Sequence, residues 1–525
     1  MRYFNTAGRC DKRFHYMVPA AERLPEARAI VDRGGYFVVH APRRTGKTTS
    51  LWALARALTG EGKYAALHFS CESAEAAGDD YGAAQRTVLA SIRRGAEIDL
   101  PGELQPPRPW PMNDEGSYLA DGLQAWARQC PRPLVLFFDD IDALRGQSLI
   151  AALRQLRDIY RIRPDHAPWS VALCGLRDVR DYKAASGGGL SRLGSSSPFN
   201  VKVRSLRLGD FSRDEVVALY AQHTGETGQS FTDEALTRAF ALTCGQPWLV
   251  NALACEVVEA MAVAPPEPIT VEHIEIAKER LIQARATHLD SLVDKLQQAR
   301  VHSIIEPLMA GTTIQATAYN DDVSYVRDLG LIAPGRTIEI ANPIYREVIV
   351  RVLSESAEQH VDPEPRPFVG SDGRLDMDRL LRAFGDFWRE HGEVLTGNLT
   401  YHEVAPQLVL MAFLQRIVNG GGFIDREYGL GRQRIDLLIR WPFADQAGQR
   451  QWQREAIELK VWRDKKADPL DKGLAQLDDY LQRLDLDHGI LVLFDRRGNA
   501  PPIADRITIE QISSPAGRQV TLLRV

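Results

Sequence analysis

The sequence predicts an α/β protein with two separate α/β cores and a helical region between them. Over the first third of the chain, apolar runs rich in β-forming residues alternate with helical pattern, as in parallel sheets with crossover helices. From residue 212 to about 292 the pattern is helical throughout, and after residue 376 an α-β-β-β-α-β order follows. Because 525 residues exceed what one hydrophobic core supports, several domains are expected.

The composition is that of a soluble globular protein, with 44% hydrophobic and 25% charged residues. No run approaches the roughly 18 apolar residues that span a membrane, so a cytoplasmic location and no membrane partner are expected. The six cysteines are scattered without a CxxC pair, which favours reduced thiols over a metal site. A net charge of -5 gives no global basic field, so any nucleic-acid contact must come from a local patch.

The first core is predicted from five apolar runs. Near-continuous apolar character is typical of parallel strands buried on both faces. The runs cover residues 36–40, 65–70, 134–140, 170–175 and 201–208.

A phosphate-binding loop is predicted directly after the first strand. Gly46, Lys47 and Thr48 match the end of the GxxxxGK[ST] pattern, although Ala41 replaces its first glycine. The turn and the following helix N-terminus point N–H groups at phosphates, Lys47 reaches the outer phosphates, and the Thr48 hydroxyl ligates magnesium. ATP and Mg²⁺ are therefore the predicted cofactors. The predicted cofactor-binding residues are Ala41, Pro42, Arg43, Arg44, Thr45, Gly46, Lys47, Thr48, Thr49 and Asp139.

A second acidic strand supports this interpretation. The run LVLFFDDID, residues 134–142, ends in carboxylates as a Walker B strand does. Asp139 would hold magnesium through water, which makes Thr48 and Asp139 the predicted metal residues of the nucleotide site. Asp140 stands where a catalytic Glu usually polarises the attacking water, and its shorter side chain leaves the hydrolysis rate open.

The next strand and loop carry less information. Cys174 and Gly175 stand where related ATPases have a polar sensor, and a plain core strand is the favoured reading. Arg177 and Arg180 could reach a phosphate or a neighbouring subunit of a homo-oligomer, whereas solvated loop arginines are the simpler account. Residues 186–199 are rich in Gly and Ser and do not look packed.

The sequence divides into five predicted regions. Two helical stretches, a short strand at 338–343 and a further helix favour a winged helix-turn-helix, which follows an all-helical lid. A polar segment rich in Pro and Gly then reads as a linker. The boundaries are 1–210 for the ATPase core, 211–295 for the lid, 296–354 for the winged helix, 355–375 for the linker and 376–525 for the second core.

Several motifs together resemble the prokaryotic AAA-type ATPases of the STAND-related group. They are HYMVP, YFVVHAPRRTGKTT, FFDDID, CGLRDV, GQPWLVN, DDVSYVRDLGLI and ANPIYREVI, spread over residues 1–353. The resemblance implies a helical lid and a winged helix after the core. It also implies that Gly245, Gln246 and Pro247 start a lid helix facing the nucleotide, and that His15 and Tyr16 lie near the base.

The second core carries a carboxylate and lysine pattern. Asp436 lies in one predicted strand, and Glu458 and Lys460 lie in the next. Because strand residues two apart share a face, Glu458 and Lys460 point the same way and Leu459 points to the opposite layer. Two carboxylates beside an ammonium make a hard-oxygen site for Mg²⁺, while Lys460 orients the nucleophile and stabilises the transition state. A Glu-x-Lys pair alone would be an ordinary surface ion pair.

Two flanking residues complete the predicted catalytic set. Glu403, before the strands, could add a third metal ligand to Asp436 and Glu458, and Gln476, in the following helix, could orient the site. Over residues 376–500 this arrangement resembles the PD-(D/E)XK nuclease superfamily, one prokaryotic branch of which is fused to an upstream ATPase. The proline of the motif is replaced by Ile435.

These patterns lead to two functional hypotheses. The first is an ATP-driven, magnesium-dependent nuclease, acting in defence or mobile-element maintenance, with DNA the favoured nucleic-acid partner. The alternative is a nucleotide-switched STAND-type signalling or scaffold protein with an inactive nuclease fold. A local basic track for a phosphate backbone, with solvated loop charges as the simpler reading, would comprise Arg426, Arg432, Arg434, Arg463, Lys465 and Lys466.

Overall fold

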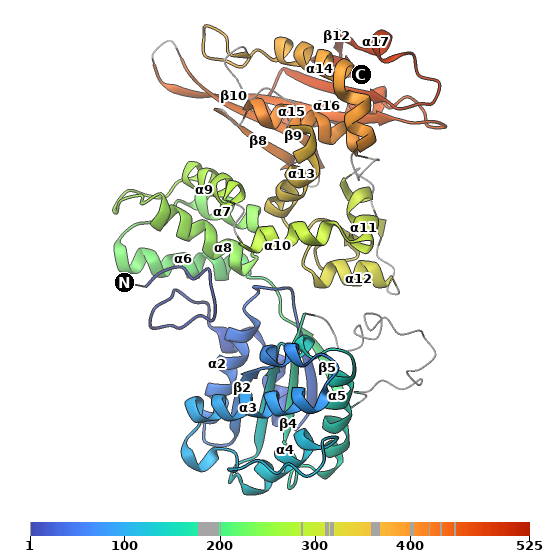
Figure 1. Ribbon diagram of the computed structural model, residues 1–525. Helices are drawn as coiled ribbons and strands as arrows, with labels where there is room; N and C mark the ends of the chain where they lie inside the picture. Colours follow the sequence, from blue (N-terminus) through green and yellow to red (C-terminus); the bar gives the residue numbers. More distant parts are fainter. Residues whose placement is uncertain are drawn as a thin grey trace. The chain divides into compact units, whose positions relative to one another are not determined.

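The structure, a computed structural model, divides into two compact units (Figure 1). Unit 1 comprises Met1–His288 and Ala318–Pro334, and unit 2 comprises Leu289–Thr317 and Gly335–Val525. The structure describes residues 2–176, 199, 201–284, 287–309, 314–315, 320–358, 368–398, 404–418, 421–430, 433–445 and 448–525.

Unit 1 is built on a five-stranded sheet in the order β2-β3-β4-β1-β5. All neighbouring strands run parallel, which confirms the predicted α/β class with a parallel sheet. The strands are β1 (Tyr36–His40), β2 (Ala65–Ser70), β3 (Leu134–Asp139), β4 (Ser170–Gly175) and β5 (Lys202–Arg207). Each lies within one residue of its predicted bounds.

Alternate strand residues feed two apolar layers, as the period of two requires. On one face, Val38, Leu67 and Leu136 pack with α3 (Tyr81–Asp99), α4 (Tyr118–Gln129) and α5 (Gly146–Ile159). On the other, Phe37 and Phe137 pack with α1 (Pro25–Asp32) and α2 (Lys47–Gly60). The sheet is therefore covered on both faces (Figure 1), and its strand ends remain for a site.

A group of helices follows the sheet in unit 1. They are α6 (Arg213–Thr227), α7 (Asp233–Thr243), α8 (Pro247–Cys255) and α9 (Val271–Gln283). A reciprocal capping box between Ser212 and Glu215 starts α6, and Gly228 ends it in the left-handed conformation at φ +75°. The predicted helical character of this region is thus observed.

Short elements occupy the next part of the chain. They are α10 (Thr287–Leu296), α11 (Ala299–Met309), β6 (Ile314–Gln315), α12 (Asp321–Asp328), β7 (Thr337–Ile338) and α13 (Pro343–Glu358). The predicted strand at 338–343 is not observed at that length: β7 pairs with β6 over two residues only, and Pro343 already begins α13. α13 also continues four residues into the predicted linker, of which residues 359–367 lie outside the described part.

Unit 2 contains a six-stranded mixed sheet in the order β12-β13-β11-β10-β9-β8. The strands are β8 (Phe423–Leu430), β9 (Gln433–Ala444), β10 (Arg450–Trp462), β11 (His488–Asp495), β12 (Thr508–Ser513) and β13 (Gln519–Arg524). The expected α-β-β-β-α-β order is present from α15 (Ala405–Val418) through α16 (Leu470–Leu484) to β11. β12 and β13 form an antiparallel pair that extends the sheet beyond the predicted strands.

Helices cover both faces of this second sheet. α16 packs Leu477 and Leu481 onto the face that carries Leu491 and Leu493 of β11. On the other side of the sheet, α14 (Met377–Asn398) contacts β11 through aromatic rings. The ring centroids of Trp388 in α14 and Phe494 in β11 lie 5.2 Å apart. The α16 face of β9 and β10 holds the predicted metal site.

Candidate nucleotide site and candidate metal site

The phosphate loop connects β1 to α2. Ala41 is fully buried, so the position of the motif's first glycine has room for one methyl group but lies within the core. Gly46 adopts φ +90°, and a Cβ there would lie 3.1 Å from Arg23 Nη1. Arg44 is also left-handed, at φ +61°. Such turns direct successive backbone N–H groups into one concavity, which fits an anion.

Lys47 and Thr48 begin helix α2 and face the loop and β3. Lys47 Nζ donates to the carbonyl oxygens of Ala41 and Pro42 over 2.8 and 2.9 Å, so its ammonium lies across the loop. Thr48 Oγ1 donates to Asp139 Oδ2 over 2.6 Å. The hydroxyl and the carboxylate that would hold magnesium are therefore already adjacent, and this donor pair fits the ion.

Asp139 is a buried carboxylate that accepts several hydrogen bonds, one of them from its neighbour Asp140 N to Oδ1 over 3.0 Å. Besides Thr48, His68 Nε2 donates to Asp139 Oδ2 over 2.9 Å. Burial opposes ionisation, but the hydrogen bond and charge of His68 and the hydrogen bond of Thr48 outweigh it. The pKa of Asp139 is lowered to about 2. The carboxylate is therefore charged at neutral pH, as a magnesium-binding group should be.

Asp140 has a different environment one residue on. Its backbone is left-handed at φ +53°, and Ser70 Oγ donates to Asp140 Oδ2 over 2.8 Å. Burial and the neighbouring charge of Asp139 raise the pKa of Asp140. Asp140 is thus the more basic carboxylate of the pair, which suits a group that polarises water.

His68 and Ser70 were not among the predicted site residues. Both lie in β2, the strand hydrogen-bonded to β3, where Ser70 pairs with Asp139 in the register. The signal available in the sequence is a polar residue at positions 68 and 70 of an otherwise apolar run, but its meaning depends on which strand lies beside β3. Cys174, the predicted core residue, is fully buried, and burial raises the pKa of its thiol.

A cavity of about 140 Å³ lies beside the phosphate loop. Its wall is formed by the loop, helices α2 and α8, and the N-terminal segment, and includes Tyr16, Val18, Gly46, Thr49, Pro247 and Trp248. Tyr16 and Pro247 were expected near the nucleotide and line the cavity. His15 instead accepts a hydrogen bond from Asp11 N at Nδ1, over 2.8 Å.

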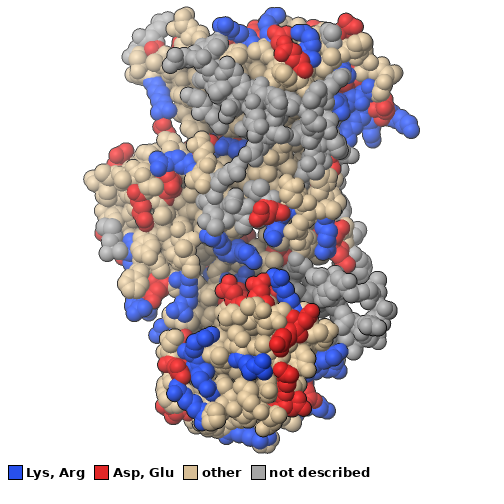
Figure 2. Space-filling model, viewed as in Figure 1, with Lys and Arg blue, Asp and Glu red and all other residues tan. Residues whose placement is uncertain are grey.

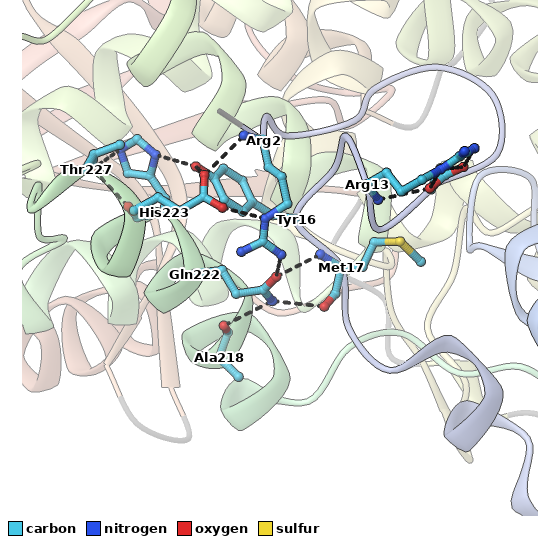
Figure 3. Close-up of polar contacts among 10 residues, drawn as sticks. Arg2, Arg13, Tyr16, Met17, Ala218, Gln222, His223 and Thr227 are labelled. Atoms are coloured by element: carbon cyan, nitrogen blue, oxygen red, sulfur yellow. Dashed lines mark hydrogen bonds and ion pairs between the residues drawn. The ribbon is translucent and has the colours of Figure 1, made fainter.

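Hydrogen bonds attach the N-terminal segment to α6 and hold this segment in the cavity wall (Figure 3). Arg2 Nε donates to Glu226 Oε1 over 2.6 Å, and Tyr16 Oη donates to Glu226 Oε2 over 3.2 Å. Gln222 bonds both the N–H and the carbonyl of Met17. Between Arg2 and Tyr16, the backbone N–H of Cys10 donates to Thr49 Oγ1 over 3.2 Å. The segment thus connects α6 to the start of α2.

The start of α8 contacts the phosphate loop. Gln246 caps the helix by accepting from Leu249 N over 2.6 Å, and its Nε2 donates to Arg44 O over 3.4 Å. The Arg44 guanidinium lies over the Trp248 ring, 5.3 Å from its centroid. Gly245 precedes the cap at φ +78°.

Helix α12 ends beside the same loop within unit 1. A Cβ at Gly330 would lie 2.7 Å from Pro42 Cβ, and Asp328 Oδ1 lies 3.8 Å from His40 Nδ1. The turn after α12 therefore packs on the backbone that would hold the phosphates. Arg177, Arg180 and residues 186–198 of the predicted loop at 186–199 lie outside the described residues, whereas Phe199 at its end is buried in the core, where no packing was expected.

The second candidate site lies in unit 2, on the α16 face of β9 and β10. Leu438 pairs with Ala456 and both face α16, so Asp436 and Glu458, two residues along each strand, fall on that face. Lys460 Nζ donates to Glu458 Oε1, and Leu459 N donates to Asp436 Oδ2 over 2.8 Å. Three of the predicted groups are therefore together.

Glu458 is nearly fully buried, and its charge state depends on its neighbours. Burial and the charge of Asp436 raise the pKa of Glu458, against the opposing effect of Lys460. Glu458 Oε2 has no hydrogen-bond partner among the described residues. A buried carboxylate oxygen without a partner, next to a second carboxylate, fits a divalent cation.

Gln476 lies on the α16 side of this site. Gly473, three residues earlier on the same helix face, is so close to β10 that a Cβ would lie 3.3 Å from Lys460 Cγ. Gln476 Oε1 is buried and, within the described ranges, has no partner. Its position is therefore suitable for a polar ligand or an orienting role.

Other predicted groups are outside what can be described. Glu403 lies outside the described residues, as do the side chains of Arg426, Arg432 and Arg434. Across the described residues, no group of three or more His, Cys, Asp or Glu side chains is arranged to hold a metal. Lys465 and Lys466 are exposed. Figure 2 shows positive and negative side chains interspersed on the face drawn.

The parallel sheet and the loop facing an acidic strand end define a P-loop ATPase domain. Residues 31–182 match a protein family described as AAA domain, which supports an AAA-type ATPase domain in this part of the chain. The structure resembles the Walker-type ATPase of Pyrococcus abyssi, with TM-score 0.46 and 13% identity, covering 66% of this chain and 99% of that chain.

Two other solved structures are similar at the same level. The Holliday junction branch migration motor RuvB of Thermotoga maritima gives TM-score 0.34 and 15% identity, covering 63% of this chain and 93% of that one. Cdc6p of Pyrobaculum aerophilum gives TM-score 0.36 and 14% identity, covering 67% and 96%. No curated protein matches the chain. Among the described residues, no helix is both long and apolar enough to cross a membrane.

Proposed function

We propose that the protein is an ATP-driven, magnesium-dependent nuclease. The observation that carries the proposal is the convergence of Asp436, Glu458 and Lys460 on one face of a mixed sheet, with Glu458 Oε2 lacking a partner among the described residues. A pair of surface charges would not be so buried, since Glu458 is only 1% exposed. A divalent cation bound there would supply activated water and charge neutralisation on a phosphodiester.

The chain's own residues have distinct proposed roles at this site. Asp436 and Glu458 hold the cation, with Glu403 as a third ligand. Lys460, now paired with Glu458, orients the nucleophile and stabilises negative charge on the reacting phosphate. Gln476 orients the site from α16. A bound cation would offset the repulsion between the two carboxylates. Cation binding would therefore lower the affinity of Glu458 for a proton.

The ATPase domain would use ATP with Mg²⁺. Lys47 binds the outer phosphates, Thr48 and Asp139 hold the ion, and Asp140 polarises the attacking water. Residues 211–295 serve as the lid and 296–354 as a winged helix, and nucleic acid, with DNA favoured, is the partner. A homo-oligomer and a role in defence or mobile-element maintenance are further parts of the proposal.

One observation favours a second candidate function. The turn after α12 packs so closely on the phosphate loop that a Cβ at Gly330 would lie 2.7 Å from Pro42 Cβ. If nucleotide binding changed the conformation of the phosphate loop, this turn would have to move with it. This arrangement suits a nucleotide-operated switch or scaffold in which the second core binds without cutting.

The test is to incubate the protein with plasmid DNA, linear DNA and RNA, with ATP and either Mg²⁺ or EDTA. We expect products with Mg²⁺, none with EDTA, and none from Glu458→Gln. Glu455→Gln is the matched control, because Glu455 lies on the same strand but the opposite face. If no substrate is cut with any divalent cation while ATP causes the protein to assemble, the nuclease function is rejected and the nucleotide-operated switch is supported.

A further inference from the structure

The cavity beside the phosphate loop is of a size that suits an aromatic ring system. An apolar cavity of about 150 Å³ takes up benzene, and this one measures about 140 Å³ and has an open side. Ring and alkyl groups of Tyr16, Val18, Leu219 and Trp248 form much of its wall. A flat heterocycle would therefore find apolar surface on its faces and would need polar partners at its edge.

Asn251 of α8 is one of the residues that line this cavity, and one hydrogen bond determines the orientation of its side-chain amide. Asn251 Nδ2 donates to Pro247 O over 2.8 Å. A carbonyl oxygen can only accept, so the nitrogen must face Pro247 and Oδ1 must point the other way. Asn251 Oδ1 is buried, and none of the described residues donates a hydrogen bond to it. The residue itself is 7% exposed.

A buried acceptor without a donor is costly, because it has lost its hydrogen bonds to water and gained none in the protein. A ligand that supplies an N–H to Asn251 Oδ1 would remove this cost, whereas a ligand that presents an oxygen would be repelled. Ser50 Oγ, on α2, is a second buried atom in the cavity wall that lacks a partner in the described part of the chain. A hydroxyl can donate or accept, so Ser50 does not distinguish the two ligands.

We infer that Asn251 selects adenine, because its Oδ1 accepts a hydrogen bond from the 6-amino group of the base. Guanine carries a carbonyl oxygen at the same ring position and would place two acceptors together. The inference rests on the proposed ATP binding and adds the residue that determines base specificity. Arg23 and Arg44, which also line the cavity, add positive charge to its wall.

The experiment removes each partner of the hydrogen bond in turn. Dissociation constants are measured for ATP, GTP and purine riboside triphosphate, which differs from ATP only by lacking the amino group, with the full-length protein and Asn251→Leu. We expect the full-length protein to bind ATP roughly tenfold more tightly than the purine riboside analogue, and GTP more weakly still. In Asn251→Leu the ratio between ATP and the analogue should fall to about one.

Ser50→Ala is the matched control. It should change the affinities for ATP and the analogue by the same factor and leave their ratio intact, whereas thermal unfolding of each variant reports folding separately. An unchanged ratio in Asn251→Leu, or a ratio of one in the unsubstituted protein, would overturn the inference while ATP binding stands. If the protein binds none of the three nucleotides, the proposed ATPase function fails as well.

Discussion

Thr48 Oγ1 and Asp139 Oδ2 lie 2.6 Å apart, which joins the first turn of α2 to the end of β3 before any ion is bound. The hydroxyl and the carboxylate come from segments about ninety residues apart in the chain. Their contact is a consequence of the parallel sheet, in which β1 and β3 end at the same edge. The closeness of the proposed magnesium-binding pair is therefore set by the fold.

Replacement of Thr48 tests this pair. Thr48→Ala removes the hydroxyl, and we expect the affinity for Mg²⁺-ATP to fall by roughly tenfold or more, since a hydrogen bond to a charged group contributes about 1.5–3 kcal/mol. Thr48→Ser keeps the hydroxyl and should retain most of the affinity. Titration of nucleotide with and without Mg²⁺ measures both. Equal affinities for the two variants would contradict the assignment.

Asp140 should affect hydrolysis more than binding. Its pKa is raised by burial and by Asp139, which fits a group that takes a proton from water. We expect Asp140→Asn to lower the rate of phosphate release by about 10²-fold or more while the Kd for ATP changes little. Asp142→Asn, two residues on, is the control and should hydrolyse ATP at the original rate. Loss of binding in Asp140→Asn would assign it a structural role.

Gly245 and Gly228 form a matched pair for stability. Both have positive φ, +78° and +75°, but a Cβ at Gly245 would lie 1.9 Å from Phe211 O, whereas nothing lies within 4 Å at Gly228. Gly228→Ala should lower the free energy of unfolding by about 1 kcal/mol. Gly245→Ala should cost at least about 3 kcal/mol, because backbone must move. Denaturant unfolding measures both, and equal costs would disprove the close contact.

His288 should make stability depend on pH. Burial, and secondarily the charge of Arg44, lower its pKa from 6.5 to about 3. Between these values the unfolded chain binds a proton that the folded protein does not, so stability rises with pH. We expect His288 to account for a loss of about 2 kcal/mol between pH 7 and pH 5.

The measurement is the free energy of unfolding at both pH values for the original protein and for His288→Leu. The variant should lose less stability on acidification than the original protein does. The comparison concerns the difference between the two pH values, so a constant effect of the substitution cancels. An identical loss of unfolding free energy between pH 7 and pH 5 in both proteins would contradict the lowered pKa of His288.

The strands and the phosphate loop could be predicted because their signals are local. An apolar run followed by APRRTGKTT identifies β1 and the start of α2 without knowledge of the rest of the fold. Glu458 and Lys460 could be placed on one face for the same reason, since strand residues alternate. Their closeness to Asp436 followed from the expectation that the two strands are adjacent in the sheet.

Other features depend on tertiary arrangement and could not be predicted. His68 meets Asp139 only because β2, not another strand, lies beside β3. The packing of Gly330 on Pro42 joins segments far apart in the sequence. Asn251 looks like an ordinary polar residue in a helical run until the cavity beside α2 is known. The polar strand β12, on the edge of its sheet, has little apolar signal.

The most direct test of the account is a time course of DNA cleavage with ATP and Mg²⁺ by four proteins: unsubstituted, Lys47→Ala, Glu458→Gln and Glu455→Gln. We expect ATP-stimulated cutting by the unsubstituted protein and Glu455→Gln, no ATP stimulation in Lys47→Ala, and no cutting above background in Glu458→Gln. Cutting by Glu458→Gln at the unsubstituted rate, or no cutting by any of the four, would contradict it.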